Sequence, residues 1–374
     1  MRILYVATVV KTHIMEFHIP YLKMLKEMGW ETAVAAKNDY DDPDDCVIPY
    51  CDTYIDIPFE RNPFNPKNVK AYKKLKKTID DGAYDIIHCH TPVGAMLTRL
   101  ASKRARKNGS KVFYTAHGFH FYTGAPLINW IAYYPVEKYL ARKTDVLVTI
   151  TKEDYQRALK FKAGRVIYTP GVGVDTNRFK TGSADNALIL RKNYSIPSEA
   201  VVFLSVGEVN ANKNHKAVIR VLPYFQDVYY VLCGRGPLID ELKALSVSLG
   251  VSDRVVFTGY RNDVVDFYAM ADIFVFPSYR EGLPVALMEA MASGLVCVAS
   301  KNRGTDDLLP ESRLLFSVSS AEELRTKLHM AMNDDCSDEI ERNIDHLKGY
   351  ELSSVLNIMK QNYLSEVGTG YLNI

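Results

Sequence analysis

Short apolar runs alternate with longer stretches of helical periodicity along most of the chain. In the first half, Gly, Pro or polar residues bound each apolar run, which is typical of short strands. Runs that are apolar on both faces indicate a parallel sheet covered by helices on each side. The expected strands are RILYVAT, ETAVAA, DIIHCH, KVFYTAHG, DVLVTIT and RVIYTPG, and the expected helices are FHIPYLKMLKEMG, PKNVKAYKKLKKTIDDG and PVGAMLTRLASKRARKNG.

The second half repeats this alternation after a segment rich in Gly and Pro, TPGVGVDTNRF, and a polar stretch, KTGSADN. Its expected strands are AVVFLSVG, DVYYVLCG, RVVFTG, ADIFVFPS and LVCVAS, and its expected helices are NHKAVIRVLPYF, PLIDELKALSVSLG, DVVDFYAM and PVALMEAMASG. We therefore predict an α/β protein with two doubly wound, Rossmann-like domains, at residues 1–175 and 176–345. Residues 346–374 are expected to form a C-terminal helix that packs back toward the N-terminal domain.

Composition and charge narrow the function classes. The formal net charge of +2 over 374 residues disfavours a general nucleic-acid binder. The charge is unevenly divided, because residues 1–175 hold 26 Lys and Arg against 19 Asp and Glu. Either the N-terminal half faces something anionic, or these charges lie on solvated helix faces. The six cysteines form no CxxC pair, which favours reduced thiols and a cytoplasmic location.

Several common motifs are missing from the sequence. The first strand leads into ATVVKTHIM rather than a G-x-G-x-x-G turn, and no G-x-x-x-x-G-K-[ST] stretch occurs, which disfavours an NAD enzyme or a P-loop NTPase. The acidic stretch NDYDDPDD lacks the glycine and final glutamate of a calcium loop, so a solvated loop is favoured there. The most apolar long segment, APLINWIAYYPVEKYLA, is interrupted by Pro135, Glu137 and Lys138, and no signal peptide or transmembrane helix is expected.

The stretch SVGEVNANKNH places Lys213 between the end of a buried strand and the start of a helix. Backbone amides and the helix dipole attract phosphate at such a position, and a lysine adds a compact positive charge. A surface lysine in an Asn-rich turn is the alternative interpretation. On its own, this motif leaves the two interpretations even.

The stretch PSYREGLPVALMEAMASG holds two glutamates eight residues apart. Because a proline suits the first position of a helix, the helix is expected to run from about Pro284 to Ser293. Glu281 then lies in the loop before the helix, and Glu289 lies within the helix among apolar residues. A carboxylate in such surroundings needs a partner, which is either a ligand hydroxyl or an arginine. Gly282 and Leu283 offer amides near the helix start, so this loop and Lys213 together suit a diphosphate.

In combination, these motifs resemble those of the retaining glycosyltransferases of family 4, which have the GT-B fold. EGLPVALME matches the E-x7-E signature, GEVNANKN resembles the phosphate-binding loop, and GYRNDVVDFYAMADIFVFPS resembles the base-binding region. PGVGVDTNRF resembles the interdomain segment, and TAHGFHFYTGAPLINWIAYYPVEKYLA resembles the subgroup of bacterial capsule and exopolysaccharide clusters. The resemblance covers nearly the whole chain and implies two domains that face each other across a cleft.

The resemblance implies a role for each matching residue. Glu281 would contact hydroxyls of the donor sugar, Glu289 would hold the ribose, and Lys213 would neutralise the diphosphate beside Gly207. The implied catalytic residues are Glu281, His117 and Lys213, and the implied donor-binding residues are Lys213, Arg261, Tyr260, Gly282, Leu283, Pro284, Glu289 and Gly207. His13, His117 and His120 are the expected acceptor-side residues.

Two departures from the family pattern change these expectations. Glu208 stands where the family commonly has a basic residue, so a second positive charge on the diphosphate must come from elsewhere. Arg261 is preferred for it over Arg235. The N-terminal glycine-rich loop of the family is also missing, so His13 either lines the cleft or is a surface or helix-capping residue.

The implied reaction moves a sugar from a nucleotide sugar, with UDP preferred over GDP, to a lipid-linked or glycan acceptor. No cofactor or metal is expected, because the protein supplies the positive charge. A cytoplasmic enzyme, peripheral on an anionic membrane surface, is expected from Phe64, the region Trp130–Tyr134 and two basic helices. Their basic residues are Lys70, Lys73, Lys74, Lys76 and Lys77, and Arg99, Lys103, Arg104, Arg106 and Lys107. A UDP-sugar 2-epimerase and an inactive paralogue acting as a partner subunit are the alternatives.

Overall fold

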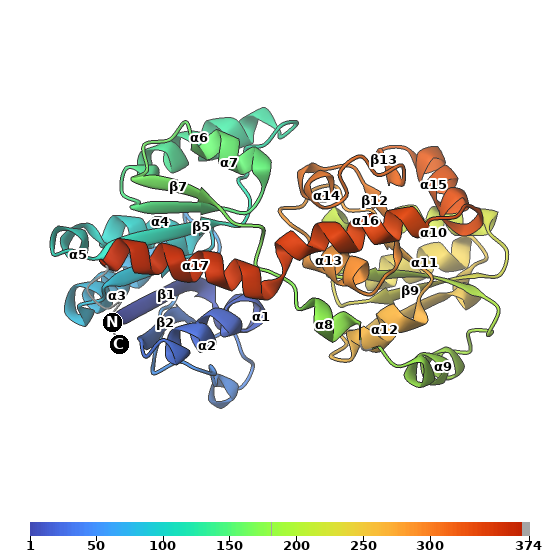
Figure 1. Cartoon of the computed structure of the whole chain (residues 1–374), viewed down its shortest axis with the longest axis horizontal. Helices are drawn as coiled ribbons and strands as arrows, with labels where there is room; N and C mark the ends of the chain where they lie inside the picture. Colours follow the sequence, from blue (N-terminus) through green and yellow to red (C-terminus); the bar gives the residue numbers. More distant parts are fainter. Residues whose placement is uncertain (181, 369–374) are drawn as a thin grey trace. The chain divides into compact units, whose positions relative to one another are not determined.

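The computed structural model describes residues 1–180 and 182–368, so residue 181 and residues 369–374 of the expected domains lie outside the described residues. The chain divides into two compact units (Figure 1). Unit 1 comprises Met1–Val172 together with the C-terminal segment from Ser353, and unit 2 comprises Gly173–Leu352. Each unit is a parallel sheet with helices on its faces, as the alternating apolar runs predict.

Unit 1 contains a seven-stranded parallel sheet in the order β3-β2-β1-β4-β5-β6-β7. Its strands are Arg2–Val9 (β1), Glu31–Lys37 (β2), Thr53–Asp56 (β3), Ile86–Cys89 (β4), Lys111–Ala116 (β5), Val146–Thr149 (β6) and Arg165–Tyr168 (β7). Its helical segments are Val10–Ile14 (η1), Met15–Phe17 (α1), Ile19–Glu27 (α2), Pro43–Asp45 (η2), Lys67–Gly82 (α3), Pro92–Ala101 (α4), Lys103–Lys107 (α5), Leu127–Ala141 (α6), Lys152–Ala158 (α7) and Leu352–Val367 (α17).

Both faces of the central strand β1 are buried, which explains its uninterrupted apolar sequence. Leu4 and Val6 point into the core on one face, and Ile3 and Tyr5 point into the core on the other. The C-terminal helix α17 adds Val355, Met359 and Tyr363 to the second core. Tyr363 also makes a buried hydrogen bond there, because its hydroxyl is 2.7 Å from the hydroxyl of Tyr5.

Unit 2 contains a six-stranded parallel sheet in the order β10-β9-β8-β11-β12-β13. Its strands are Val201–Val206 (β8), Val228–Cys233 (β9), Val255–Gly259 (β10), Ile273–Phe276 (β11), Val296–Ser300 (β12) and Leu315–Phe316 (β13). Its helical segments are Thr176–Phe179 (α8), Ala184–Asn193 (α9), Ala211–Lys213 (η3), His215–Val221 (α10), Leu222–Tyr224 (η4), Ile239–Ser248 (α11), Ser252–Arg254 (η5), Val264–Met270 (α12), Val285–Ala292 (α13), Arg303–Leu308 (α14), Ala321–Asn333 (α15), Ser337–Leu347 (α16) and Lys348–Tyr350 (η6).

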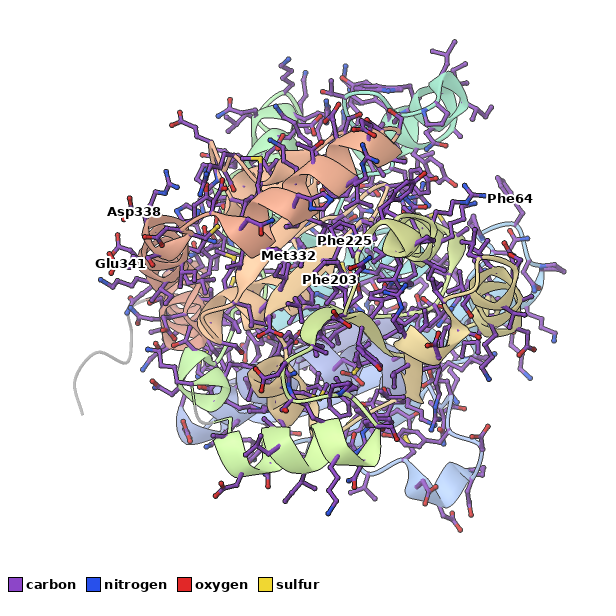
Figure 2. The ribbon with its side chains drawn as sticks, turned by 90° about the vertical axis from the view of Figure 1, so that its right-hand side faces the viewer. Phe64, Phe203, Phe225, Met332, Asp338 and Glu341 are labelled. Carbon is purple, nitrogen blue, oxygen red and sulfur yellow. The ribbon has the colours of Figure 1, made fainter. Side chains whose placement is uncertain are left out.

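Aromatic and aliphatic side chains fill the core of unit 2. Phe203 and Phe225 are buried with ring centroids 5.6 Å apart, and Met332 packs against the same core (Figure 2). Asp338 and Glu341 in the same view belong to the polar face of α16. Burial of a large apolar side chain contributes about 1.5–3 kcal/mol, so this core is the main source of the unit's stability.

The structure differs from the sequence prediction in a few elements. The short edge strands β3 and β13 were not predicted, because neither forms a long apolar run. The single helix predicted over residues 92–109 is divided into α4 and α5 at Ser102, whose hydroxyl donates to the Thr98 carbonyl. The six cysteines are free thiols, as expected.

Candidate active site

The loop after β8 is a compact turn that places Lys213. Asn210 caps the short η3 turn by accepting a hydrogen bond from the Lys213 amide at 3.1 Å. Asn214 then takes the left-handed conformation, with φ of 53°, and α10 begins at His215. Asparagine tolerates this conformation better than most residues, which explains the Asn-rich sequence of the turn.

A second loop, between β11 and α13, is held to the first by hydrogen bonds to its backbone. The Asn212 carbonyl accepts from the Tyr279 amide at 2.8 Å, and the Asn212 side chain donates to the Arg280 carbonyl at 3.0 Å. The Asn214 side chain donates to the Pro277 carbonyl at 3.3 Å. The two stretches that the sequence analysis singled out are therefore neighbours at the carboxyl ends of β8 and β11, which are paired in the sheet.

Lys213 and Glu281 form an ion pair at the junction of these loops. The Lys213 Nζ lies 2.8 Å from Glu281 Oε1, and both side chains are mostly buried, at 20% and 15% exposure. The same ammonium lies 4.8 Å from the centroid of the Phe276 ring. A partly buried charge pair of this kind holds a positive and a negative group side by side in a site with little water.

Glu289 lies on α13, which begins at Val285, one residue later than predicted. Its carboxylate accepts a hydrogen bond from the hydroxyl of buried Tyr268 at 2.9 Å. Burial, followed by the neighbouring Glu289 charge, raises the pKa of Tyr268 well above its usual value. The sequence interpretation offered a ligand hydroxyl or an arginine as the partner of Glu289, and in the structure a tyrosine hydroxyl donates to it.

Arg303 is a neighbour of the site that sequence reasoning missed. Its Nε donates to the Glu281 carbonyl at 3.0 Å. The next residue must be a glycine, because a Cβ atom on Gly304 would lie 2.0 Å from the Gly282 carbonyl oxygen. The only signal in KNRGTDD was the capping box formed by Asn302 and Thr305, which indicates a helix start and says nothing of a site.

The two arginines expected near the diphosphate have other contacts. Arg261 forms a two-pronged ion pair with Asp263, with Nε 2.8 Å from Oδ1. Its guanidinium also lies over the Phe267 ring, while that of Arg235 lies over Tyr260 at 5.7 Å. Glu208, at the position where the family commonly has a base, accepts from the Asn210 side chain. These contacts of Arg261 and Arg235 do not include Lys213 or Glu281.

Unit 1 holds a cluster of histidines that includes two of the expected acceptor-side residues. The rings of His13 and His117 are 5.1 Å apart, and His90 Nδ1 lies 3.2 Å from His117 Nε2. Burial lowers the pKa of His117 to about 4 and, with the neighbouring His117, lowers that of His13 to about 3. His18 and His88 complete the cluster. These two and His90 were not predicted, although the spacing in DIIHCH places His88 and His90 on one face of a strand.

His120, the third expected acceptor-side residue, lies apart from this cluster. Its ring stacks on Tyr133 of α6, with centroids 4.6 Å apart, and its carbonyl accepts from the Asn129 side chain. A small cavity is nevertheless lined by His117, His120, Tyr133 and Glu137. His117 therefore borders both the histidine cluster and the cavity that His120 faces.

The prediction that Arg99 faces a membrane is wrong. Arg99 is 1% exposed and is held by Glu137 through two hydrogen bonds of 2.8 and 3.1 Å. Its guanidinium also stacks over Tyr114 at 4.0 Å. A buried arginine of this kind stabilises the contact between α4 and α6, and periodicity alone could not distinguish it from its exposed neighbours.

The exposed apolar side chains of unit 1 gather on α6. Leu127, Ile128 and Ile131 are 74%, 65% and 63% exposed, whereas Trp130 and Tyr134 pack against the core. Phe64 is 92% exposed. Over residues 1–180 and 182–368, no helix has both the length and the apolar character needed to cross a bilayer.

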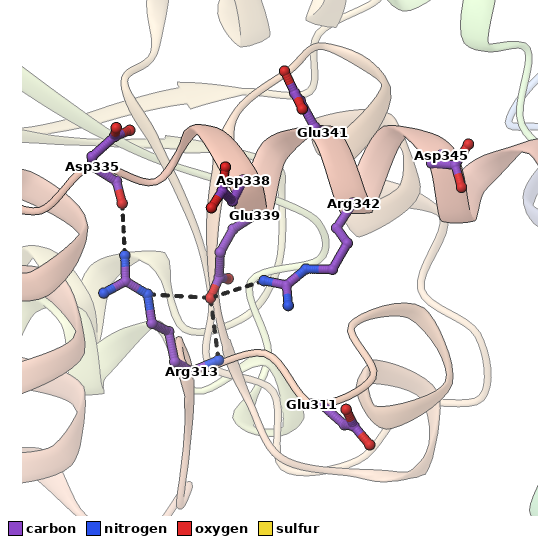
Figure 3. A pocket seen from close by; sticks show the side chains of 8 residues that line it. All are labelled: Glu311, Arg313, Asp335, Asp338, Glu339, Glu341, Arg342 and Asp345. Atoms are coloured by element: carbon purple, nitrogen blue, oxygen red, sulfur yellow. Dashed lines mark hydrogen bonds and ion pairs between the residues drawn. The ribbon is translucent and has the colours of Figure 1, made fainter.

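A polar groove of unit 2 lies along α16, and Lys213 is not among its lining residues. It is lined by Glu311, Arg313, Asp335, Asp338, Glu339, Glu341, Arg342 and Asp345 (Figure 3). Glu339 lies 3.4 Å from Arg313 and 3.5 Å from Arg342, so its charge is matched by two arginines. The contacts of Glu339 with the two arginines indicate a local, stabilising charge network.

Comparisons with known proteins follow the division into two units. The sequence model described as "Glycosyl transferase 4-like" matches residues 2–151, and the one described as "Glycosyl transferases group 1" matches residues 187–345. "Putative glycosyltransferase EpsD" of Bacillus subtilis is 41% identical over 85% of this chain and 83% of its own length. The chain belongs to the group 1 glycosyltransferases.

A further relative and a solved structure of similar fold are more distant in sequence. A UDP-Gal:alpha-D-GlcNAc-diphosphoundecaprenol alpha-1,3-galactosyltransferase of Escherichia coli is 26% identical over 82% of this chain and 76% of its own. A crystal structure of Anabaena Alr3699/HepE in complex with UDP and glucose has a TM-score of 0.80 at 18% identity, covering 97% of this chain and 99% of that one. The fold of the two units is thus the GT-B fold, as the motifs predicted.

Proposed function

We propose that this glycosyltransferase is a retaining hexosyltransferase that moves a sugar from a UDP-sugar to a lipid-linked or glycan acceptor. Its place would be in bacterial surface polysaccharide synthesis, of a capsule or an exopolysaccharide. The observation that carries the proposal is the Lys213–Glu281 ion pair beside the start of α13. A cation for the diphosphate and a carboxylate for the sugar lie side by side there, with the amides of the helix start next to them.

The donor would occupy the carboxyl ends of β8 and β11. Lys213 and the amides near Gly207, Gly282 and Leu283 would bind the diphosphate, and Pro284 ends this loop. When the donor binds, its phosphates would replace Glu281 as the partner of Lys213, and Glu281 would then bind hydroxyls of the sugar. Glu289, already positioned by Tyr268, would accept hydroxyl groups of the ribose. Tyr260 and Arg261 are the residues proposed to border the base.

UDP is proposed as the nucleotide because one relative bears it in its name and one structure of similar fold holds it. The Escherichia coli relative is named for UDP-Gal, and the Anabaena structure holds UDP and glucose. A GDP-mannose-dependent relative from Mycobacterium tuberculosis is 27% identical over 59% of this chain, so GDP-sugars belong in the same test.

Retention of configuration is proposed to follow front-face attack. The leaving phosphate oxygen would take the proton of the acceptor hydroxyl, while Lys213 stabilises the negative charge that develops on the diphosphate. Glu281 would position the sugar and would form no covalent bond. Because Lys213 and backbone amides supply the positive charge, the reaction is proposed to need no metal at the diphosphate.

The acceptor is proposed to bind unit 1 near His13, His117 and His120. The cavity that His117 and His120 line opens beside α6, whose exposed apolar side chains would contact a membrane surface. A nearby groove lined by Lys103, Lys107, Lys111 and Lys143 adds positive charge suited to anionic lipids. The enzyme is therefore proposed to work at the inner face of the cytoplasmic membrane on a lipid-diphosphate acceptor.

An activity assay with a panel of UDP- and GDP-sugars tests the proposal. UDP release should require both one particular UDP-sugar and membranes or lipid-diphosphate glycans, and the new linkage should keep the anomeric configuration of the donor. Release of a 2-epimer without acceptor would overturn the proposal in favour of an epimerase. Full activity in cells that carry Glu281→Ala would favour an inactive paralogue that acts as a partner subunit.

A further inference from the structure

Four histidines of unit 1 converge on a single point. One ring nitrogen from each of His13, His18, His90 and His117 lies within 4.8 Å of the others, the one such group among residues 1–180 and 182–368 that could hold a metal ion. The Nδ1 of His90 and the Nε2 of His117 are 3.2 Å apart. Two nitrogens bound to one tetrahedral zinc ion, at about 2.05 Å each, are about 3.4 Å apart. The His90–His117 pair thus has about the spacing of two ligands of one ion, and the four nitrogens together, within 4.8 Å, would draw closer to complete the shell.

Four ring nitrogens of this group, on His13, His18 and His90, lack the hydrogen bonds that burial normally requires. His18 and His90 are each 2% exposed. Both nitrogens of His18, the Nε2 of His90 and the Nε2 of His13 are buried without a partner. Buried polar atoms are nearly always satisfied, so four such atoms in one place indicate a missing ligand.

The neighbouring His88 provides an internal contrast. Its ring centroid is 4.1 Å from that of His90, and it is equally buried. However, its Nδ1 lies 2.6 Å from the Tyr363 hydroxyl and its Nε2 lies 2.8 Å from Thr115 Oγ1. Burial in this core therefore does not by itself leave a histidine unsatisfied. Among the histidines that the structure describes, the buried nitrogens without a partner belong to His13, His18 and His90.

The backbone holds these histidines at the carboxyl ends of neighbouring strands. His90 follows β4 and His117 follows β5, while β1 between β2 and β4 leads into His13. His13 is placed by η1, a π-helical turn, and His18 by the break between α1 and α2. Single π-turns are rare and are frequently found at functional sites.

We propose that His13, His18, His90 and His117 bind a divalent transition-metal ion of the class that prefers imidazole, represented by Zn²⁺. Four neutral imidazoles are borderline-soft nitrogen donors, which suit zinc, copper or nickel far better than magnesium or calcium. No carboxylate belongs to the group within the described residues, which further disfavours the oxygen-seeking ions. From the sequence we expected no metal, and the reason given, positive charge from the protein at the donor diphosphate, applies to unit 2, whereas the proposed site lies in unit 1.

Metal binding would fix the orientation of His117. The Nε2 of this ring faces His90 and the cluster, while the ring also lines the cavity shared with His120. The ion would thus act as a structural anchor for the proposed acceptor side, with His117 as a positioning residue. The proposed metal site does not depend on the donor site proposed in unit 2. Its test measures metal content and not sugar transfer.

The test uses the full chain, produced without a histidine tag, stripped with a chelator and titrated with Zn²⁺ and Co²⁺. The wild type should bind about one ion per chain, show the visible bands of four-coordinate Co²⁺, and unfold at a higher temperature with Zn²⁺ than with chelator. The His18→Asn and His90→Asn variants should lose all three properties. The His329→Gln variant, which removes an exposed histidine of α15, should keep them.

The wild type alone can overturn the proposal, even if a variant fails to fold. If the folded wild-type chain takes up no stoichiometric ion, the cluster is only a buried packing arrangement. The same conclusion follows if the His18→Asn variant binds the ion as well as the wild type does. Uptake that His329→Gln abolishes would place the ion outside the cluster and would also contradict the proposal.

Discussion

Glu289 gives the residue-scale test of how the nucleotide is held. Its carboxylate accepts a hydrogen bond from the Tyr268 hydroxyl, and we propose that this carboxylate binds the ribose. Glu289→Gln keeps the shape but removes the charge, and hydrogen bonds to charged groups contribute about 1.5–3 kcal/mol. The Kd of UDP, measured by calorimetry, should therefore rise about 10- to 100-fold. Glu241→Gln on the exposed face of α11 is the control, and an unchanged Kd in Glu289→Gln would contradict the ribose assignment.

His215 makes the stability of unit 2 depend on pH. Burial lowers the pKa of His215 from 6.5 to about 4, so the folded unit favours the neutral ring. The neutral His215 ring contributes fully to the free energy of unfolding above pH 6.5, and this contribution is lost as the pH falls toward 4. Between pH 7 and pH 5 this difference removes about 2 kcal/mol from the free energy of unfolding.

Hydrogen exchange in β8 and β9 measures that loss. The His215→Gln variant should be less stable at pH 7, because the ring lies 3.0 Å from the Tyr230 hydroxyl in the core. Between pH 7 and pH 5 it should lose less stability than the wild type. Equal losses in the two proteins would show that His215 does not carry this pH dependence.

At the scale of elements, the close contact between the α13 loop and α14 leads to another prediction. A Cβ at residue 304 would lie 2.0 Å from the Gly282 carbonyl and 3.1 Å from Pro284 Cδ. Gly304→Ala should therefore displace the loop, lower the stability by about 1–3 kcal/mol and weaken donor binding. Gly349→Ala is the matched control, since no heavy atom lies within 4 Å of its added Cβ. Similar unfolding midpoints for the two variants would rule out this close packing.

The exposed face of α6 leads to a prediction about membranes. Leu127→Glu with Ile131→Glu removes apolar side chains that are 74% and 63% exposed, so the fold should be little affected. Flotation with anionic liposomes should fall at least several-fold for this variant, because both apolar contact and charge attraction are reduced. Leu188→Glu on α9, 60% exposed in the wild type, should float like the wild type. Salt-insensitive flotation, or flotation unchanged by the α6 substitutions, would contradict the membrane surface proposed here.

The sequence predicted elements well where apolar runs were long. The strands β1 and β8 and the loop–helix stretch from Glu281 to Ala292 follow from apolar periodicity and from Pro and Gly positions. The two-residue strand β13 and the edge strand β3 carry too few buried residues for a pattern. Whether a charged residue on a helix is buried depends on a partner from another element, and Arg99 with Glu137 illustrates this limit.

At the scale of the whole molecule, two parallel sheets could be predicted from the chain, and so could the stretches that carry Lys213 and Glu281. Their 2.8 Å contact, the approach of Arg303 and the convergence of four histidines depend on strand order. Strand order brings residues far apart in the sequence to one edge of a sheet, and a single sequence carries no direct record of it. The residues of a site can thus be nominated from motifs, while their mutual contacts need the fold.

Thermal unfolding with nucleotide sugars tests directly whether a nucleotide sugar binds at Lys213. A ligand at 100 times its Kd adds about 2.7 kcal/mol of stability, so one UDP-sugar should raise the Tm of the wild type by several degrees. Lys213→Ala should lose that rise, whereas Lys192→Ala on exposed α9 should keep it. A wild type whose Tm no UDP- or GDP-sugar raises, or a Lys213→Ala variant that responds as the wild type does, would contradict the proposed donor site.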